Sequence, residues 1–349
     1  MRIAQIAPLA EAVPPRLYGG TERIVSYLTE QLVREGHEVT LFASGDSRTA
    51  AELVPGWPRA LRLDPAVRDP IPYALMSLDD VRRRAHEFDV LHFHIDMLHF
   101  PLFRDMAART VTTLHGRLDL PDLPPFYDRF PEFPLVSISD DQRRPLPQAN
   151  WLGTVYHGLP VDLLRPGAGQ GGYLAFLGRI SPEKRPDLAI EIAQRAGLPI
   201  RVSAKVDNVD REYFEAQIKP LLRLPGVEFI GEIGEAQKSD FLGNAFALLF
   251  PIDWPEPFGL VMIEAMACGT PVIAFRRGSV PEVLEDGLTG YIVDGVAEAV
   301  RAIGRLHWLD RVAIRRRFEQ RFSAARMARD YVALYESLAS QRIRGRRVA

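Results

Sequence analysis

The sequence predicts an α/β protein of two doubly wound domains that face a central cleft. Its 349 residues exceed what one hydrophobic core usually serves. Short apolar runs alternate with amphipathic segments in two successive series, which is typical of parallel sheets covered by helices. A stretch rich in glycine and proline, residues 151–172, separates the two series. We therefore place an N-terminal domain at residues 1–158 and a second domain at residues 159–324.

The first series opens with a β-α-β unit. Residues 2–8 (RIAQIAP) and 37–43 (HEVTLFA) are predicted strands, and residues 21–36 form a predicted helix between them. Further strands are predicted in the segments DVLHFHI (89–95), ARTVTTLH (108–115) and PLVSIS (134–139).

The second series repeats this alternation. Its predicted strands are residues 173–179, 198–205, 227–233, 246–252 and 272–275, and its predicted helices are residues 185–197, 210–226, 239–245 and about 258–268. A last amphipathic helix is predicted at about residues 325–341. Ligands of parallel sheets bind beyond the carboxyl ends of the strands, so the loops that follow the strands are the candidates for function.

Composition narrows the class of protein. With 47% hydrophobic and 25% charged residues, the chain matches a soluble globular enzyme. A formal net charge of −2 provides no global field for nucleic acid or for an anionic membrane. The one cysteine, Cys268, excludes an internal disulfide and suits a reducing compartment. Because neither a signal peptide nor a membrane-spanning run is evident, we expect a cytoplasmic protein.

The segment DWPEPFGLVMIEAMACGTPVI (253–273) contains the strongest candidate site. Its helix is apolar on every face except for Glu264, and burying a lone carboxylate is costly unless a specific partner meets it. The helix begins near Phe258, Gly259 and Leu260, where unpaired N–H groups and the helix dipole favour an anion. Glu256 lies about 10 Å from Glu264 by helical rise. This spacing fits the sugar and the ribose of a nucleotide diphosphosugar; the alternative is that Glu264 pairs with an arginine and Glu256 is solvated.

Two cations flank the loop in FLGRISPEKRPDLAI (176–190). Arg179 and Lys184 follow a predicted strand and precede a helix, at the edge where ligands bind. Lys184 is one of four lysines in a chain that otherwise uses arginine. These cations suit a leaving diphosphate, whereas the alternative is a pair of surface charges.

In the first domain, Gly19 and Gly20 precede a predicted helix, and paired glycines allow a ligand to approach the backbone; an ordinary tight turn is the alternative. Their spacing does not fit the G-x-G-x-x-G pattern of dinucleotide sites. His115 ends a predicted strand and would place an imidazole at the cleft edge, with a core or capping histidine as the alternative.

A rival hypothesis comes from DVLHFHIDMLHF (89–100). On a strand, His92 and His94 share one face with Asp96, and this H-x-H-x-D spacing resembles the ligands of a metallohydrolase. Met97 occupies the place where such sites usually have another histidine, so we predict no metal site.

Taken together, these motifs resemble glycosyltransferase family 4, whose members have the two-domain GT-B fold and retain anomeric configuration. The resemblance runs nearly end to end and rests on EPFGLVMIE with its continuation AMACGTPVIA, on GRISPEKRPD, on YGGTE and on VYHGLPVD. It implies two Rossmann-like domains, an acceptor-side domain at residues 1–158 and a donor-binding domain at 159–324. It also implies that the last helix crosses back to complete the first domain.

The resemblance further implies roles for individual residues. Glu256 would contact the donor hexose and Glu264 the ribose, while Arg179 and Lys184 would hold the diphosphate. His115 would lie beside the reacting sugar, which makes it and Glu256 the expected catalytic residues.

The second strand of the donor-binding domain departs from the pattern of this family. Many relatives have a glycine-rich turn after it, whereas this chain reads VSAKVDN (202–208), and Lys205 is a further candidate for phosphate contact. The segment FIGEIG (229–234) is expected to pass the nucleotide base, with backbone groups near Glu232 and Ile233 in contact.

The expected reaction is transfer of a hexose to an acceptor hydroxyl with retention, by front-face attack and without a divalent metal or other cofactor. The donor is a nucleotide diphosphosugar, with UDP-glucose expected first and GDP-mannose second. The acceptor is a saccharide, a lipid-linked or a small molecule, so peripheral membrane contact is compatible with this expectation, but nucleic acid is not an expected partner. The alternatives are a non-catalytic nucleotide-sugar-binding protein and, less favoured, the metallohydrolase.

Overall fold

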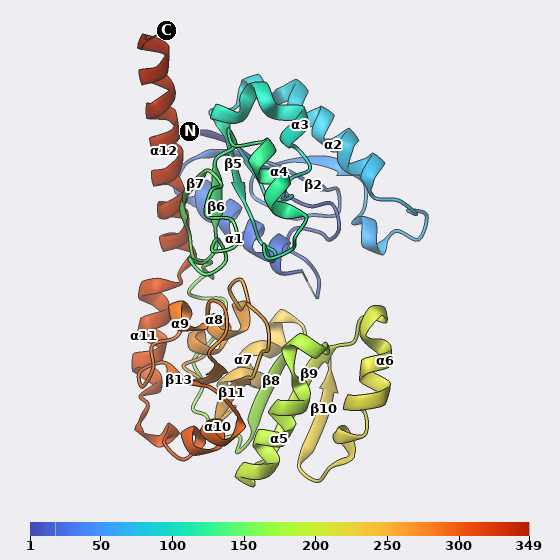
Figure 1. The fold of residues 1–349 in the computed structure, drawn as a ribbon, viewed down its shortest axis with the longest axis vertical. Helices are drawn as coiled ribbons and strands as arrows, with labels where there is room; N and C mark the ends of the chain where they lie inside the picture. The colour runs from blue at the N-terminus through green and yellow to red at the C-terminus, as the bar shows by residue number, and fades with distance from the viewer. Residues whose placement is uncertain (18, 349) are drawn as a thin grey trace. The chain divides into compact units, whose positions relative to one another are not determined.

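The computed structural model describes residues 1–17 and 19–348, and the side chains of those before residue 341. The chain forms two compact units (Figure 1). Unit 1 consists of Met1–Gly158 together with the segment from Ala324 onward, and unit 2 is Leu159–Ser323.

Unit 1 contains a parallel sheet of seven strands in the order β3-β2-β1-β4-β5-β6-β7. Because β1 is internal and the chain moves outward from it in both directions, the sheet is doubly wound. The strands are β1 (Arg2–Ile6), β2 (Glu38–Ser44), β3 (Glu52–Trp57), β4 (Val90–Phe93), β5 (Thr110–Thr113), β6 (Leu135–Ser137) and β7 (Trp151–Thr154). The helices are α1 (Gly20–Arg34), α2 (Ile71–Arg84), α3 (Phe100–Phe103), α4 (Leu123–Arg129) and α12 (Ala324–Val348).

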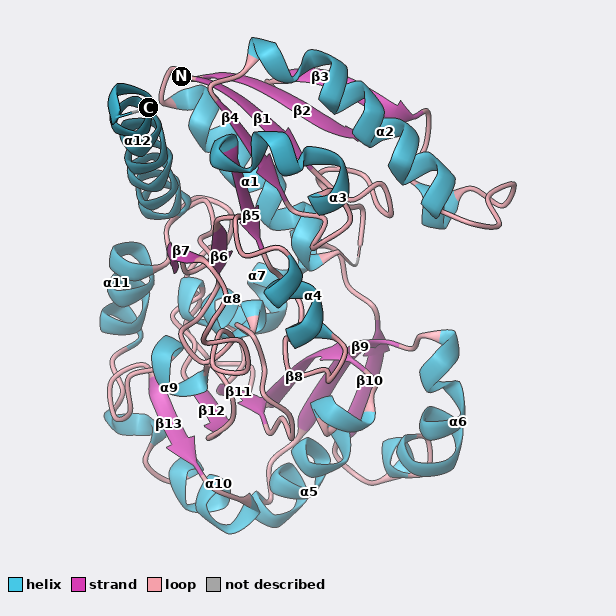
Figure 2. Ribbon diagram, turned by 45° about the horizontal axis from the view of Figure 1, so that its top comes forward, coloured by secondary structure: helices cyan, strands magenta, loops and turns pink. Residues whose placement is uncertain are grey.

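Unit 2 contains a parallel sheet of six strands in the order β10-β9-β8-β11-β12-β13. The strands are β8 (Leu174–Arg179), β9 (Ile200–Lys205), β10 (Val227–Gly231), β11 (Ala247–Phe250), β12 (Val272–Phe275) and β13 (Gly290–Val293). The helices are α5 (Pro186–Ala196), α6 (Arg211–Tyr213), α7 (Glu235–Gly243), α8 (Leu260–Ala267), α9 (Val280–Val283), α10 (Val296–Ile303) and α11 (Arg311–Arg321). Helices α5 and α10 lie side by side (Figure 2), and α8 packs against α7 and α11. The predicted pair of doubly wound α/β units is confirmed.

Helix α12 belongs to unit 1, as predicted for the last helix, and packs beside α1. Its side chains Tyr331 and Tyr335 are buried in that unit. The hydroxyl of Tyr331 lies 2.9 Å from Thr113 Oγ1 on β5, and the hydroxyl of Tyr335 lies 2.7 Å from His92 Nδ1 on β4. These bonds join the end of the chain to the middle of the first sheet.

Several elements differ from the prediction. Strand β3, helix α2 and the edge strand β7 were not predicted, and α7 begins at Glu235, four residues before the predicted helix at 239–245. The predicted helix at 210–226 is instead a series of short turns, with α6 followed by a π-helical turn at Phe214–Ile218 and a 3-10 turn at Leu221–Arg223.

Candidate functional site

The candidate site of unit 2 lies where four parallel strands end. The loop after β8 contains Lys184, the loop after β11 contains Glu256, and Lys205 and Glu232 lie at the ends of β9 and β10. Because these strands are parallel and lie in one sheet, their carboxyl ends form one edge, which is where α/β sheets bind ligands.

Lys184 and Glu256 form an ion pair between two of these loops. Glu256 is only 8% exposed, and its Oε2 also accepts a hydrogen bond of 2.8 Å from the indole N–H of Trp254. The ammonium of Lys184 lies over the Trp254 ring, 5.0 Å from its centre, which adds a cation–π contact. The alternative that Glu256 is a solvated loop residue is wrong, because this carboxylate is buried and directly opposite a cation.

The Glu256 loop is held in place by two residues that follow β12. A Cβ at Gly278 would lie 2.3 Å from the backbone nitrogen of Glu256, so no larger residue fits there without moving the loop. The next residue, Ser279, donates from its N–H to the Glu256 carbonyl at 3.0 Å and from its hydroxyl to the Phe258 carbonyl at 2.9 Å.

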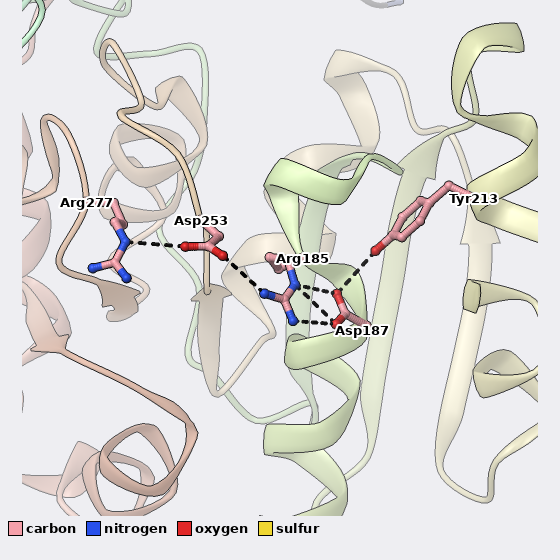
Figure 3. Close-up of polar contacts among 5 residues, drawn as sticks. All are labelled: Arg185, Asp187, Tyr213, Asp253 and Arg277. Atoms are coloured by element: carbon pink, nitrogen blue, oxygen red, sulfur yellow. Dashed lines mark hydrogen bonds and ion pairs between the residues drawn. The ribbon is translucent and has the colours of Figure 1, made fainter. Parts of the chain in front are cut away.

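A ladder of ion pairs links the same loops from outside (Figure 3). The carboxylate of Asp253 accepts from Arg185 Nη1 at 3.3 Å and from Arg277 Nε at 3.5 Å. Arg185 also forms a bidentate pair with Asp187, to which the Tyr213 hydroxyl donates at 3.2 Å. Arg185 follows Lys184, Asp253 precedes Glu256 and Arg277 precedes Gly278, so the ladder spans the three loops that shape the site.

Helix α8 starts at this edge. Its N-cap is Gly259, which has φ of 78°, a left-handed conformation that favours glycine. A Cβ there would lie 2.7 Å from Met262 Cε, which further restricts the position. Phe258 is buried beside it, and Leu260 begins the helix. The first N–H groups of a helix have no partner within it, so this end favours an anion.

Glu264 lies inside α8 and is 5% exposed. Its Oε1 accepts a hydrogen bond of 2.6 Å from Nζ of Lys238, which comes from α7 and is 9% exposed. The alternative interpretation of Glu264 expected an arginine as its partner. This expectation is wrong, because the partner is a lysine. Lys238 was missed, although its rarity in this chain was a usable signal.

Arg179 and Lys205 form a second charged group. Arg179 donates to Glu183 Oε1 at 2.8 Å, and its guanidinium also lies 3.4 Å from Asp210 Oδ2 and 3.9 Å from Asp207 Oδ2. Lys205 pairs with the other oxygen of Asp207 at 2.8 Å. Arg179 and Lys205 are therefore brought together through Asp207, whereas Lys184 has a different partner, Glu256.

Glu232 and Ile233 lie in the segment between β10 and α7. The side chain of Glu232 is exposed and that of Ile233 is half-buried. Gly234 then caps α7, and its N–H donates a hydrogen bond of 3.0 Å to Gln237 Oε1.

In unit 1, His115 follows β5 and is only partly exposed. Its Nε2 lies 2.9 Å from Nδ1 of His94, and its ring stacks on that of His157 with centres 5.3 Å apart. Burial lowers the pKa of His115 to about 3, so the imidazole is neutral at neutral pH.

Gly19 and Gly20 lie at the start of α1 in the same unit. Gly19 is the N-cap, with φ of 150°, and a Cβ there would lie 2.8 Å from Pro15 Cβ. Packing against Pro15 and a positive φ explain the need for glycine at this position, whereas Gly20 is exposed.

The histidines of the metal hypothesis are occupied by protein partners. Nδ1 and Nε2 of His92 lie 2.7 Å from the Tyr335 hydroxyl and 2.8 Å from Thr113 Oγ1, and Nε2 of His94 lies 2.8 Å from Gln5 Oε1. Within the described residues, no three histidine, cysteine or acidic side chains are grouped to hold a metal ion. We therefore interpret the two histidines of the H-x-H-x-D pattern as core residues that are hydrogen-bonded beneath α12.

Two doubly wound α/β units match the GT-B architecture expected for a glycosyltransferase, and comparison with known proteins agrees. The profile described as Glycosyl transferases group 1 matches residues 168–320, and that of Glycosyltransferase Family 4 matches residues 18–151. The chain belongs to glycosyltransferase family 4.

Three individual relatives share between 18% and 32% sequence identity with this chain. A D-inositol 3-phosphate glycosyltransferase of Streptomyces griseus subsp. griseus is 32% identical over 219 residues, which are 58% of this chain and 42% of that protein. The chain thus matches less than half the length of this relative. A phosphatidyl-myo-inositol mannosyltransferase of Mycobacterium leprae is 25% identical over 97% of this chain and 98% of its own length. The fold resembles that of a sucrose-phosphate synthase from Thermosynechococcus elongatus, with a TM-score of 0.79, 18% identity and coverage of 98% and 100%.

None of the helices in the described part of the chain combines the length and the apolar character needed to span a membrane.

Proposed function

We propose that this glycosyltransferase moves a hexose from a nucleotide diphosphosugar to an acceptor hydroxyl with retention of configuration. One observation carries the proposal: the buried carboxylate of Glu256 and the ammonium of Lys184 meet beside the amino end of α8, with the second buried carboxylate, Glu264, inside that helix. This arrangement matches the chemical order of hexose, diphosphate and ribose along a donor.

In the proposed complex, the diphosphate caps α8 at Phe258, Gly259 and Leu260. Glu256 accepts hydrogen bonds from hydroxyls of the hexose, and Glu264 accepts them from the ribose. Hydroxyl donors suit these carboxylates because a buried acceptor that finds a donor avoids the cost of desolvation. The base passes the backbone near Glu232 and Ile233.

The cations then hold the diphosphate. Lys184 pairs with Glu256, four residues before α8 begins, and we propose that its ammonium moves from that carboxylate to the diphosphate. Arg179 and Lys205 are weaker candidates, because Arg179 faces three carboxylates and Lys205 shares one of them, Asp207. Gly19 and Gly20 are proposed to contact the donor from unit 1, and His115 to lie beside the hexose.

Front-face attack is the proposed chemistry. The acceptor oxygen forms a bond to the anomeric carbon on the face from which the nucleotide diphosphate leaves, and the bond from that carbon to the phosphate oxygen breaks. The departing phosphate oxygen takes the proton of the acceptor. Lys184 and the amino end of α8 stabilise the charge that develops on the leaving group, so we propose that no divalent metal is needed.

For the substrates, we keep UDP-glucose as the first donor and GDP-mannose as the second, since one relative is named a mannosyltransferase. Two relatives are named for inositol phosphate or phosphatidyl-inositol, which makes an inositol-type hydroxyl the acceptor to test first. We propose a cytoplasmic location, with peripheral membrane contact if the acceptor is lipid-linked.

Lys184→Met tests the proposal, with Lys219→Met as its matched control. Lys219 forms an exposed i,i+4 pair with Glu215, so its loss leaves the site untouched. Transfer is measured with UDP-glucose and GDP-mannose on D-inositol 3-phosphate, with and without EDTA, and the product anomer is assigned by NMR. We expect Lys184→Met to lower kcat by about 100-fold or more, as losing one donor to a developing anion does. Full turnover in that variant, an inverted product or loss of wild-type activity in EDTA would each contradict the proposal.

A further inference from the structure

A buried chain of polar side chains crosses the first sheet from α12 to His115. It connects β1, β4 and β5 with the C-terminal helix, and all its inner members are buried: Gln5, His92, His94, Thr113, Tyr331 and Tyr335. Such residues in a sheet core are costly unless each polar atom has a partner, so the direction of every hydrogen bond is constrained.

The amide of Gln5 fixes the proton on His94. Gln5 Oε1 lies 2.8 Å from His94 Nε2, and an amide oxygen can only accept, so Nε2 of His94 carries a hydrogen. Gln5 is itself oriented by α12, because its Nε2 donates to the Tyr335 hydroxyl at 3.3 Å. That hydroxyl, having accepted from Gln5, donates its own hydrogen to His92 Nδ1 at 2.7 Å.

The same logic passes from His94 to His115. Burial and the neighbouring histidines hold the pKa of His94 well below its usual value, so the ring is neutral and has one hydrogen, on Nε2. Its Nδ1 is therefore an acceptor. Nε2 of His115 lies 2.9 Å from that atom and must donate, which leaves Nδ1 of His115 without a hydrogen.

We propose that Gln5 and His94 are positioning residues that hold His115 in the tautomer with a hydrogen on Nε2 and a bare Nδ1. His115 then offers a ligand a hydrogen-bond acceptor rather than a donor, and it prefers a hydroxyl of the sugar over its ring oxygen. This consequence rests on the proposed function, in which His115 lies beside the hexose, whereas the tautomer itself does not.

The tautomer is read directly from a two-bond ¹H–¹⁵N spectrum of histidine-labelled wild-type protein, with His115 assigned by its absence in His115→Gln. We expect a protonated Nε2 and a bare Nδ1. A protonated Nδ1 in the wild type would overturn the inference, whatever the activity of the enzyme.

Three variants then test who sets the tautomer. His94→Asn keeps an oxygen near the place of Nδ1 and should preserve both the spectrum and the donor KM within about twofold. His94→Phe keeps a ring without the acceptor, and Gln5→Leu removes the amide oxygen. We expect these two to give mixed tautomers and a donor KM raised about tenfold, with a smaller change in kcat, as loss of one hydrogen bond predicts.

The outcomes separate this inference from the proposed function. If His115 stays entirely in its wild-type tautomer in both His94→Phe and Gln5→Leu, the positioning role of Gln5 and His94 is overturned. If the spectra change as expected but no nucleotide-sugar is transferred by the wild type, the proposed function fails and the positioning role stands.

Discussion

The buried pair of Lys238 and Glu264 gives a sharp test of how unit 2 is held together. Lys238→Met removes the ammonium while keeping a side chain of similar length, so the packing of α7 on α8 is preserved. Glu264 is then left as a buried carboxylate that has lost its 2.6 Å partner.

The expected cost follows from burial. The side chains of Lys238 and Glu264 are 11% and 6% exposed, so water can screen little of the interaction. Breaking a buried pair from one side costs about 3–5 kcal/mol. The lower end applies here because Glu235, 3.5 Å from Lys238 and nearer to solvent, shares the ammonium. We expect a loss of about 3 kcal/mol for the unit 2 transition.

Urea denaturation followed by tryptophan fluorescence measures this loss, since Trp254 and Trp308 both report on unit 2. A double-mutant cycle with Glu264→Gln isolates the pair, and the double variant should recover about 2 kcal/mol relative to the sum of the single changes. Lys219→Met serves as the control, because its pair with Glu215 is about half exposed and such pairs contribute about 0.5 kcal/mol or less.

The reasoning would be refuted if Lys238→Met cost no more than Lys219→Met. Glu264 would then be stable without a cation, either protonated or solvated in the folded unit, and its description as a buried charged partner of α7 would be wrong.

Two further predictions concern acid stability and the Glu256 loop. The pKa of His115 is about 3 in the folded protein and about 6.5 in the unfolded chain, so the unfolded chain binds more protons as pH falls. The neutral His115 therefore contributes fully to the free energy of unfolding above pH 6.5, and this contribution is lost as pH falls below that value. Between pH 7.5 and 5.5 the free energy of unfolding should fall by about 1.4 kcal/mol because of this histidine. Urea denaturation at the two pH values should show a smaller fall in His115→Gln and an unchanged one in the control His307→Gln, whose histidine is exposed. The same fall in wild type and His115→Gln would assign it to other groups. Gly278→Ala should displace Glu256 and lower both the transfer rate and the free energy of unfolding. The control Gly287→Ala also has a positive φ but open space around its Cβ, so it should lower the free energy of unfolding by only about 1 kcal/mol. Equal losses in the two variants would show that backbone strain, and not the contact with Glu256, sets the cost.

The pattern of strands and helices could be predicted from sequence where each element is apolar and internal. Strand β3 could not, because ELVPGW contains Pro55 and Gly56, which argue against a strand. The structure places β3 at the edge of the sheet, where a missing N–H is tolerated because no neighbour needs it. Edge position is a property of the whole sheet, and local sequence does not report it.

The burial of Glu264 was predictable, but its partner was not. The apolar faces around Glu264 required a buried carboxylate, and the structure has one. Lys238 lies 26 residues earlier in α7, and the predicted helix began one residue after it. The first turn of α7, which was not predicted, is capped by a hydrogen bond from the Gly234 N–H to Gln237 Oε1. Neither glycine nor glutamine marks a helix start clearly in a sequence. A helix start without Ser, Thr, Asp or Asn is easily placed too late.

The cations of the site show a more general limit. Arg179 and Lys205 could be recognised as cations at a sheet edge, yet what neutralises them depends on how two loops fold toward each other. Glu183, Asp207 and Asp210 surround them, so two positive charges face three negative ones. Asp210 is buried, and this burial raises the pKa of its carboxyl, so the group differs from a solvated surface pair. An anion that binds Arg179 must therefore displace a carboxylate, so binding there exchanges one partner for another. Lys184 has a single carboxylate, Glu256, and this smaller rearrangement is why it is the stronger candidate for the leaving phosphate.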